Sequence, residues 1–326
     1  MVGHGSWNAA ELPLESRRLL RVAVPGSSGA VRPELPFQVV VGKVRKPRVL
    51  LIAGVHGDEY ESVAALHDLA TEINARAVSG TVVIVPVANP SAFHSGMRRS
   101  PVDLTDLNRS FPGNPQGSFT ERLADVIFRN FVIGAEAVLS MHCWSREATV
   151  IPYVEYPAGK TPVAKKSAAL ARILGAEFLH PYTWHPGLLV AAAVAHGIPA
   201  VESEVGGQGT VTPAGQRSYR SIAYRFLQAT RVLVPTAEQT GTSSQPAKVI
   251  THADYRANQA GLFRSRVSPG EEVEKGSLLG AIYGLAGECV EEVRAPGGGI
   301  VGIMRTFAAV QPGDLLFQLF RPLRRA

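Results

Sequence analysis

Continuous apolar runs alternate with segments of helical periodicity through the middle of the chain. Residues 48–53, 81–86 and 137–141 are apolar runs typical of strands buried on both faces, and residues 62–77 and 120–131 carry apolar side chains at helical spacing. Strands that alternate with helices in this way are typical of a parallel sheet covered by helices on both faces. The pattern therefore predicts an α/β fold built on a mostly parallel mixed sheet flanked by helices.

The alternation continues on both sides of these segments. Two short stretches near the N-terminus have the alternating pattern of edge strands, and further strands and helices follow the central region. The expected edge strands are residues 20–24 and 37–41, the later strands are 149–155 and 200–203, and the later helices are 163–174 and 214–233. Residues 88–118 are expected to form one long loop, and loops of that length in compact domains are often functional.

The pattern changes near residue 235. Residues 236–247 are polar and rich in turn formers, which predicts a linker. From residue 248 onward, short strand-like segments are separated by Gly/Pro turns, and this is typical of a small all-β domain. We therefore expect an α/β domain over residues 1–235, whose first part supplies the edge strands, and a smaller barrel-like β domain over residues 248–326.

The composition restricts the kinds of molecule that the protein is expected to bind. The chain has 326 residues, with 33 Lys and Arg against 27 Asp and Glu, and the resulting charge of +6 is dispersed rather than gathered in a stripe with aromatic residues. We therefore expect no nucleic-acid partner. No apolar run approaches the roughly 18–20 residues that cross a bilayer, the N-terminal segment lacks a secretory pattern, and the two cysteines are expected to stay reduced. These features predict a cytoplasmic protein without a membrane partner. They do not determine the oligomeric state, and a homo-oligomer is compatible with them.

His56 and Glu59 lie in a Gly-flanked loop directly after the apolar run 48–53. Ligands of open α/β sheets bind at the carboxyl ends of strands, so this loop brings an imidazole and a carboxylate to the expected cleft. Gly54 and Gly57 allow the backbone to turn so that both side chains reach one ion. Two histidines and a carboxylate are a common ligand set of catalytic zinc. If His56 and Glu59 bind zinc, we therefore expect a second histidine as the third ligand.

That histidine is expected from another strand end, and His142 directly follows the apolar run 137–141. The alternative interpretation of His142 is a hydrogen-bonded histidine of the core. His67 lies on an expected helix, whereas the other histidines have no comparable strand-end position, although His94 and His185 could still line the cleft. The remaining candidates are His180, His196 and His252.

Residues 95–113 concentrate charge within the expected long loop. Arg98 and Arg109 could bind a substrate carboxylate through paired N–H donors, with Asn108 beside them. The alternative is a solvated loop whose arginines pair with aspartates of the same segment.

Glu202 and Glu204 lie on a strand-like segment that ends in glycines at residues 206–207. Side chains alternate along a strand, so both carboxylates project to the same face and spacing alone does not choose between them. Either could act as a general base that deprotonates an attacking water and then protonates a leaving amine. The alternative is a structural carboxylate paired with a loop arginine.

Four of these features occur in one order over roughly residues 45–235 and resemble the succinylglutamate desuccinylase/aspartoacylase family of zinc deacylases, which is related to the zinc carboxypeptidases. They are Gly-Val-His-Gly-Asp-Glu at 54–59, Asp-Leu-Asn-Arg-Ser-Phe-Pro-Gly at 106–113, the strand end at His142 and Glu-Val-Gly-Gly at 204–207. The resemblance implies one zinc ion per chain, bound by His56, Glu59 and His142.

The resemblance also implies roles for the remaining residues. Asn108, Arg109 and an upstream arginine would bind the substrate carboxylate and polarise the scissile carbonyl; Arg98 is the candidate and Arg99 its competitor. Because the catalytic glutamate of the family precedes an apolar residue and a glycine, the resemblance selects Glu204 over Glu202. The family often has an aspartate two residues before the third ligand, where this chain has Ser140, so the carboxylate that orients His142 must be missing or come from elsewhere.

The C-terminal segment resembles the β domain appended in this family, with turns like those of biotinyl and lipoyl domains. Residues 283–287 lack the lysine that such domains modify, so we expect a structural role or a narrowed access to the zinc. The whole sequence predicts a zinc-dependent amidohydrolase that removes an acyl group from a small anionic N-acylated amino acid. The alternatives are a metallocarboxypeptidase that acts on peptides and a non-catalytic metal-binding or interaction protein.

Overall fold

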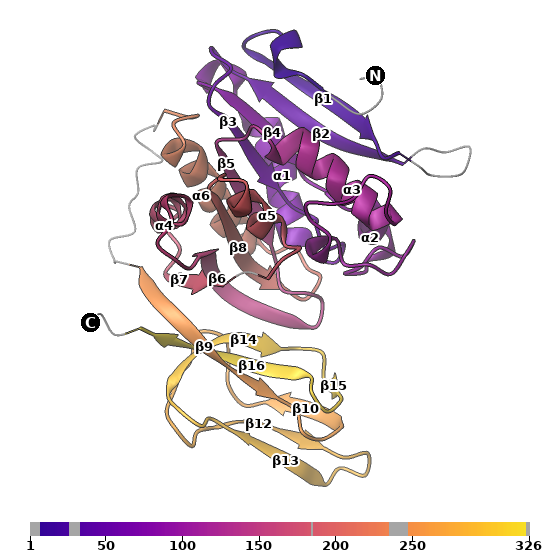
Figure 1. Ribbon diagram of the computed structural model, residues 1–326. Helices are drawn as coiled ribbons and strands as arrows, with labels where there is room; N and C mark the ends of the chain where they lie inside the picture. Colours follow the sequence, from indigo (N-terminus) through magenta and orange to yellow (C-terminus); the bar gives the residue numbers. More distant parts are fainter. Residues whose placement is uncertain (1–6, 26–32, 184, 235–246, 324–326) are drawn as a thin grey trace.

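The computed structural model of the protein describes residues 7–25, 33–183, 185–234 and 247–323. Strands and helices alternate through the first two thirds of the chain (Figure 1). The strands are β1 (Ser16–Ala23), β2 (Glu34–Val41), β3 (Arg48–Ile52), β4 (Thr81–Val85), β5 (Ala137–His142), β6 (Ala148–Pro157), β7 (Phe178–Tyr182) and β8 (Ala200–Gly207). The helices are α1 (Tyr60–Glu72), α2 (Pro90–Ser95), α3 (Phe119–Ile127), α4 (Pro162–Ile173), α5 (Leu189–Ala195) and α6 (Pro213–Ala229).

These strands join one mixed sheet in the order β1-β2-β4-β3-β5-β8-β6-β7. The four central strands β4, β3, β5 and β8 are parallel, and their near-continuous apolar sequences suit strands that are covered on both faces. β2 and β6 join them antiparallel on either side. The predicted mixed sheet flanked by helices is therefore confirmed.

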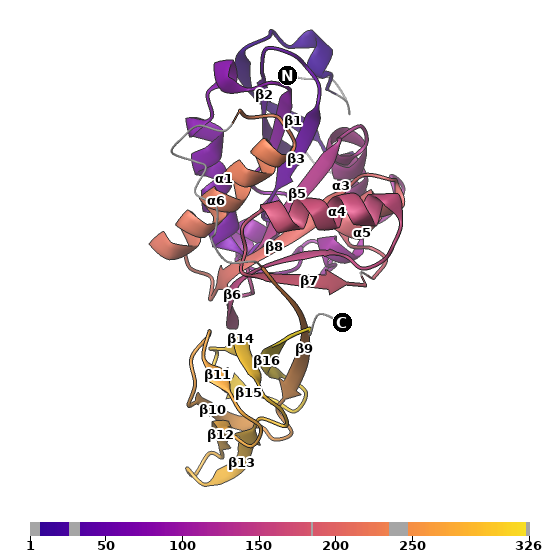
Figure 2. The same cartoon turned by 90° about the vertical axis from the view of Figure 1, so that its left-hand side faces the viewer.

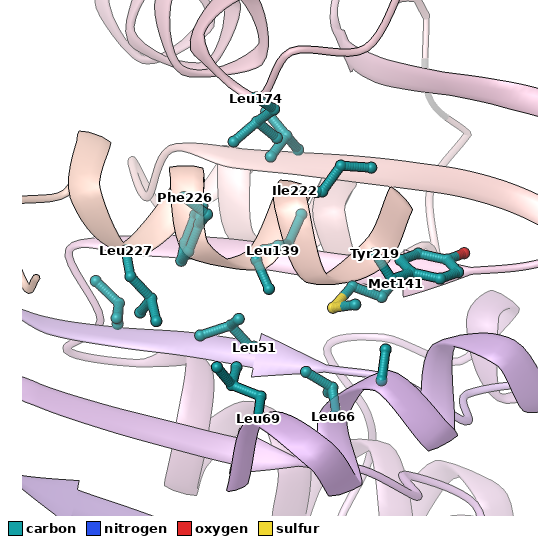
Figure 3. Packing of buried hydrophobic residues seen from close by; sticks show 14 of the residues in the cluster. Leu51, Leu66, Leu69, Leu139, Met141, Leu174, Tyr219, Ile222, Phe226 and Leu227 are labelled. Carbon is teal, nitrogen blue, oxygen red and sulfur yellow. The ribbon is translucent and has the colours of Figure 1, made fainter. Parts of the chain in front are cut away.

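Helices cover both faces of the sheet. α1, α4 and α6 pack on one face and α3 and α5 on the other, and Figure 2 shows α1 and α6 side by side along the sheet. In Figure 3, Leu51 and Leu139 of the sheet lie between Leu66 and Leu69 of α1 and Phe226 of α6. None of the helices in the described ranges is both long and apolar enough to span a membrane.

The structure corrects three local expectations. Residues 88–118 are not one loop, because the Asn89 side chain caps α2 and the Asp106 side chain caps a 3-10 turn at Leu107–Arg109. The helix expected over 62–77 ends at Glu72, and a separate 3-10 turn follows it. Strand β7 was not expected, since its five residues show no alternation of apolar and polar side chains.

The C-terminal part of the chain is all β (Figure 1). Its strands are β9 (Lys248–Arg256), β10 (Gly261–Ser265), β11 (Glu272–Val273), β12 (Leu278–Tyr283), β13 (Cys289–Arg294), β14 (Gly299–Arg305), β15 (Ala309–Val310) and β16 (Leu315–Pro322). β13, β12, β10 and β15 form a four-stranded sheet, whereas β9, β16, β14 and β11 extend the first sheet to 12 strands. The predicted linker at 236–247 lies outside the described residues except for Ala247, and the division into two domains stays a prediction.

The two parts of the chain share backbone pairing and a hydrophobic cluster. β9 pairs in parallel with β7, and β14 pairs antiparallel with β6. Phe320 of β16 is fully buried at this junction, with its ring 5.3 Å from that of Tyr153 on β6 and 5.7 Å from that of Phe178 on β7. The all-β part is therefore packed against the edge of the α/β sheet.

Replacing Phe320 by Ala should destabilise the protein by about 3–5 kcal/mol, because it leaves a cavity at the junction. Leu285→Ala is the control, since Leu285 is fully exposed in the β12–β13 turn. The free energy of unfolding, measured in denaturant, checks both variants. A loss below about 1 kcal/mol for Phe320→Ala would show that the junction is not a packed core.

Candidate active site

The candidate residues gather at the carboxyl ends of the central parallel strands. Side chains alternate along each strand, and Val138 of β5 and Ala200 of β8 pack on the α3–α5 face. Ser140 and His142 follow Val138 on that face, and the cross-strand pairs Ser140–Glu202 and His142–Glu204 place the two glutamates beside them. The loop after β3 brings His56 and Glu59 to the same place.

His56, Glu59 and His142 form a buried cluster. The Nδ1 atom of His56 lies 2.6 Å from Glu59 Oε1, and the Nδ1 atom of His142 lies 3.0 Å from Glu59 Oε2. One ligand atom of each residue lies within 4.8 Å of the other two, which is close enough for the three to hold one metal ion. The structure thus brings together the three residues that the sequence proposed as ligands.

The charges of this cluster reinforce one another. Burial alone would raise the pKa of Glu59, but the charges of His56 and His142 outweigh it and hold this pKa well below its usual range. Burial alone would lower the pKa of His142, but Glu202 and Glu59 raise it to about 10. The protein therefore holds negative charge around His142 that suits a cation, either a proton or a metal ion.

The second nitrogen of each imidazole also has a polar neighbour. His56 Nε2 lies 3.2 Å from Asp106 Oδ1. His142 Nε2 lies 2.9 Å from Ser140 Oγ and 3.5 Å from Glu202 Oε2. Ser140 stands where the family often has aspartate, and the nearest carboxylate to this nitrogen comes from Glu202 on the adjacent strand.

Glu202 and Glu204 differ in what they contact. Both line the cavity above the cluster, but Glu202 is buried with its carboxylate 3.5 Å from His142 Nε2, whereas Glu204 is half-buried. Burial and the neighbouring charge of Glu59 raise the pKa of Glu204 well above its usual range. Its Oε2 atom is buried without a hydrogen-bond partner among the described residues. An unpaired carboxyl with a raised pKa is suited to proton transfer.

The arginine candidates take different positions. Arg98 lines the cavity, with its Nε 3.2 Å from Asp106 Oδ2 and its Nη1 3.7 Å from Glu59 Oε1. Arg109 is exposed at the cavity wall, and Arg99 is exposed and does not belong to the described lining. Asn108 is buried, and its Oδ1 accepts a hydrogen bond from the backbone N–H of Leu189 at 3.0 Å. The geometry therefore favours Arg98 over Arg99 as the upstream arginine.

The cluster forms the floor of a cavity of about 440 Å³. This volume lies within the roughly 300–1,000 Å³ typical of small-molecule sites. The C-terminal strands form one wall of the cavity, which agrees with the expected narrowing of access, although the sequence did not identify the residues of this wall. The lining includes Glu155 and Tyr182 of β6 and β7, His252, Asp254 and Arg256 of β9, and Leu315 and Gln318 of β16.

The other histidines of the described ranges do not belong to the His56–Glu59–His142 cluster. His185 and His252 line the cavity, and His180 hydrogen-bonds to Glu155 beside it. His67, His94 and His196 are exposed on or beside helices. Neither described cysteine forms a disulfide, as expected.

Glu61 is a further residue that sequence reasoning missed. It is buried, and its Oε1 accepts hydrogen bonds from the backbone N–H of Thr212 at 3.0 Å and from the Thr212 hydroxyl at 2.5 Å. Gly206 lies so close to this carboxylate that a Cβ there would stand 1.6 Å from Glu61 Oε2. Glu61 thereby fixes the turn between β8 and α6, directly after Glu204.

Known proteins share both the sequence and the fold. Residues 45–230 match the family model for the succinylglutamate desuccinylase/aspartoacylase catalytic domain. N-alpha-acetyl-L-2,4-diaminobutyric acid deacetylase of Halomonas elongata is 31% identical over 287 residues, which cover 85% of this chain and 83% of that protein.

Two solved structures are similar over nearly the whole chain. The product-bound ectoine utilization protein EutE (DoeB) of Ruegeria pomeroyi has a TM-score of 0.85 and 26% identity, covering 95% of this chain and 97% of that one. A succinylglutamate desuccinylase/aspartoacylase from Rhodobacter sphaeroides has a TM-score of 0.86 and 27% identity, covering 96% and 98%. On this sequence and structural similarity, the chain belongs to the succinylglutamate desuccinylase/aspartoacylase family.

Proposed function

We propose that the protein is a zinc-dependent amidohydrolase that removes the acyl group from a small N-acylated amino acid. The observation that carries this proposal is the convergence of His56, Glu59 and His142 on the floor of a cavity that Glu204 and Arg98 also line. The relative from Halomonas elongata is named as a deacetylase of an N-acetylated amino acid, which supports the same reaction class.

The donor set fits zinc. Two imidazole nitrogens and one carboxylate are a common protein ligand set of catalytic zinc sites, and both imidazoles here have the oriented second nitrogen that such ligands require. When bound, zinc would supply Lewis-acid polarisation of the scissile carbonyl and a lowered pKa of water. His56, Glu59 and His142 would hold it, one ion per chain.

Glu204 would transfer the proton. Its carboxylate would accept a proton from the attacking water, and the resulting carboxylic acid would then protonate the leaving nitrogen as the amide bond breaks. The raised pKa of Glu204 favours the protonated form that the second step requires.

The arginines would bind the substrate and its developing charge. The Arg98 guanidinium is held between Glu59 and Asp106 at the cavity edge, and Arg109 lies on the same loop. Together with Asn108 they would bind the carboxylate of the amino acid or stabilise the oxyanion. Fixed positive groups are suited to both tasks.

The structure gives less support to the two alternatives. The wall formed by β9 and β16 narrows the cavity, which favours an amino-acid derivative over a peptide. The missing aspartate before His142 favoured a non-catalytic protein, but Glu202 Oε2 on the neighbouring strand lies 3.5 Å from His142 Nε2 and would take the place of that carboxylate. A cytoplasmic location and a homo-oligomer stay predictions from the sequence.

Glu204→Gln should keep the metal and lose turnover. The amide cannot accept the proton of water, so kcat on an N-acetylated amino acid should fall about 10²–10⁴-fold. Zinc content, measured on the purified protein, should match that of the wild type. Dialysis against a chelator should abolish wild-type hydrolysis, and added zinc should restore it.

The control is Glu292→Gln, a carboxylate exposed on β13, which should leave both zinc content and kcat unchanged. Full activity of Glu204→Gln would show that the assigned base is wrong.

Glu202→Gln should weaken zinc binding by about 10–100-fold, because it removes the carboxylate that orients His142. Competition with a chromogenic chelator measures the zinc dissociation constant directly, without an activity assay. Glu204→Gln is the matched control, since Glu204 lies on the same strand face but makes no hydrogen bond or ion pair with His142 among the described residues. Equal affinities of the two variants would contradict the orienting role of Glu202.

A further inference from the structure

One side of the cavity is built by β6, β7, β9 and β16, and its polar groups form a continuous chain. Glu155 Oε1 lies 3.0 Å from His180 Nδ1. The rings of His180 and His252 are 4.8 Å apart, and His252 Nε2 lies 3.7 Å from Asp254 Oδ1. The chain therefore begins in the α/β part at Glu155 and ends in the C-terminal part at Asp254.

This side of the cavity carries more negative than positive charge. Glu155 and Asp254 are its carboxylates outside the immediate surroundings of the metal ligands. Among the described lining residues that come from β6, β7, β9 and β16, Arg256 is the one arginine or lysine. Its side chain is 55% exposed, and it donates one N–H to the carbonyl oxygen of Gly313. Burial and the nearby His180 lower the pKa of His252, which keeps its imidazole neutral at physiological pH. A cation that enters here meets little repulsion.

Asp254 is also held in place. Its Oδ1 accepts a hydrogen bond from Gln318 Nε2 at 2.9 Å, and its Oδ2 accepts one from Arg256 Nη2 at 3.0 Å. The backbone pairing of Gln318 with Asp254 between β16 and β9 fixes this arrangement. A carboxylate that is already held in its binding position loses less conformational entropy when a ligand binds, which increases the affinity.

The proposed function leaves one part of the substrate without a partner. The acyl amide would lie at the metal cluster and the carboxylate at Arg98 and Arg109, so the side chain of the amino acid remains to be placed. An acidic side chain would face Glu155 and Asp254, and like charges at close range are unfavourable. An ammonium group has only donors, which match carboxylate acceptors.

We propose that the side of the cavity that carries Glu155 and Asp254 is a subsite for a positively charged side chain of the N-acylated amino acid. This inference rests on the proposed function and narrows its substrate to short basic amino acids. Independently of the cavity, the relative that is 31% identical is named for a substrate whose side chain ends in an amine, 2,4-diaminobutyric acid. In this protein the C-terminal strands would therefore select the substrate as well as narrow the cavity.

Three N-acetylated amino acids of similar side-chain length test the subsite. N-α-acetyl-2,4-diaminobutyrate has a cationic side chain, N-acetylnorvaline is its neutral isostere, and N-acetylglutamate is anionic. With the zinc-loaded full-length protein, kcat/KM should be at least about tenfold higher for the cationic compound than for the neutral one, and lowest for the anionic one.

Asp254→Asn should remove this preference. Its kcat/KM for the cationic compound should fall about tenfold, mainly through KM, while its kcat/KM for N-acetylnorvaline stays within about twofold of the wild type. The unchanged rate on the neutral compound also shows that the variant is folded. Glu155→Gln should act in the same direction, and Glu292→Gln is the control that should change neither rate.

The outcomes separate the subsite from the proposed function. Hydrolysis without a preference for the cationic compound, or a preference that Asp254→Asn leaves unchanged, would overturn the subsite and keep the deacylase. Failure to hydrolyse any of the three compounds would count against the deacylase. In that case, calorimetry with free 2,4-diaminobutyrate tests the subsite without catalysis. If Asp254→Asn binds this compound about tenfold more weakly than the wild type does, the subsite is supported. If the two proteins bind it equally, the subsite is overturned.

Discussion

Glu59 is a carboxylate buried between His56 and His142, and a buried charge is tolerated only where opposite charge or hydrogen-bond donors surround it. Much of the local structure follows from this requirement. Each imidazole contacts one oxygen of Glu59 through Nδ1, and the backbone N–H of Cys143 donates to Oε2 at 3.1 Å. At Nε2, His56 meets Asp106 and His142 meets the hydroxyl of Ser140, with the carboxylate of Glu202 3.5 Å away. The cluster thus connects the loops after β3 and β5, the 3-10 turn at Leu107–Arg109 and strand β8.

The sheet is continuous from the α/β part to the C-terminal strands, so a row of polar side chains extends from one part to the other. On one face of the sheet, side chains from adjacent strands stand opposite one another, so β5, β8, β6 and β7 present Ser140, Glu202, Glu155 and His180 in one row. β9 pairs with β7, and its His252 packs against His180 with Asp254 beyond it. An appended domain joined only by a flexible linker could not hold Asp254 in a fixed place. Backbone pairing and the buried Phe320 make the C-terminal strands part of the cavity.

Local signals in the sequence predicted the central strands and the first pair of candidate ligands. Continuous apolar runs predicted β3, β4 and β5, and the Gly-flanked His56–Glu59 pair was identified from its place after a strand. The proximity of Glu202 to His142 was not predictable, because it depends on the register between β5 and β8, which joins residues far apart in the chain. The same holds for Asp254, whose place in the cavity lining requires the pairing of β7 with β9. The caps of the loop over 88–118 were local signals, from Asn89 and Asp106, that went unrecognised.

The distribution of charge in the cavity gives the appended strands a chemical role. Arg98 and Arg109 come from the long loop of the α/β part, whereas Asp254 comes from β9. A substrate that carries both a carboxylate and an ammonium group can satisfy both walls at once, and its amide is then oriented over the metal cluster by two charged contacts instead of one. On the proposed assignment, the wall that the C-terminal strands contribute could change while His56, Glu59, His142 and Glu204 stay the same. Different segments of one continuous sheet would then determine the specificity and the reaction.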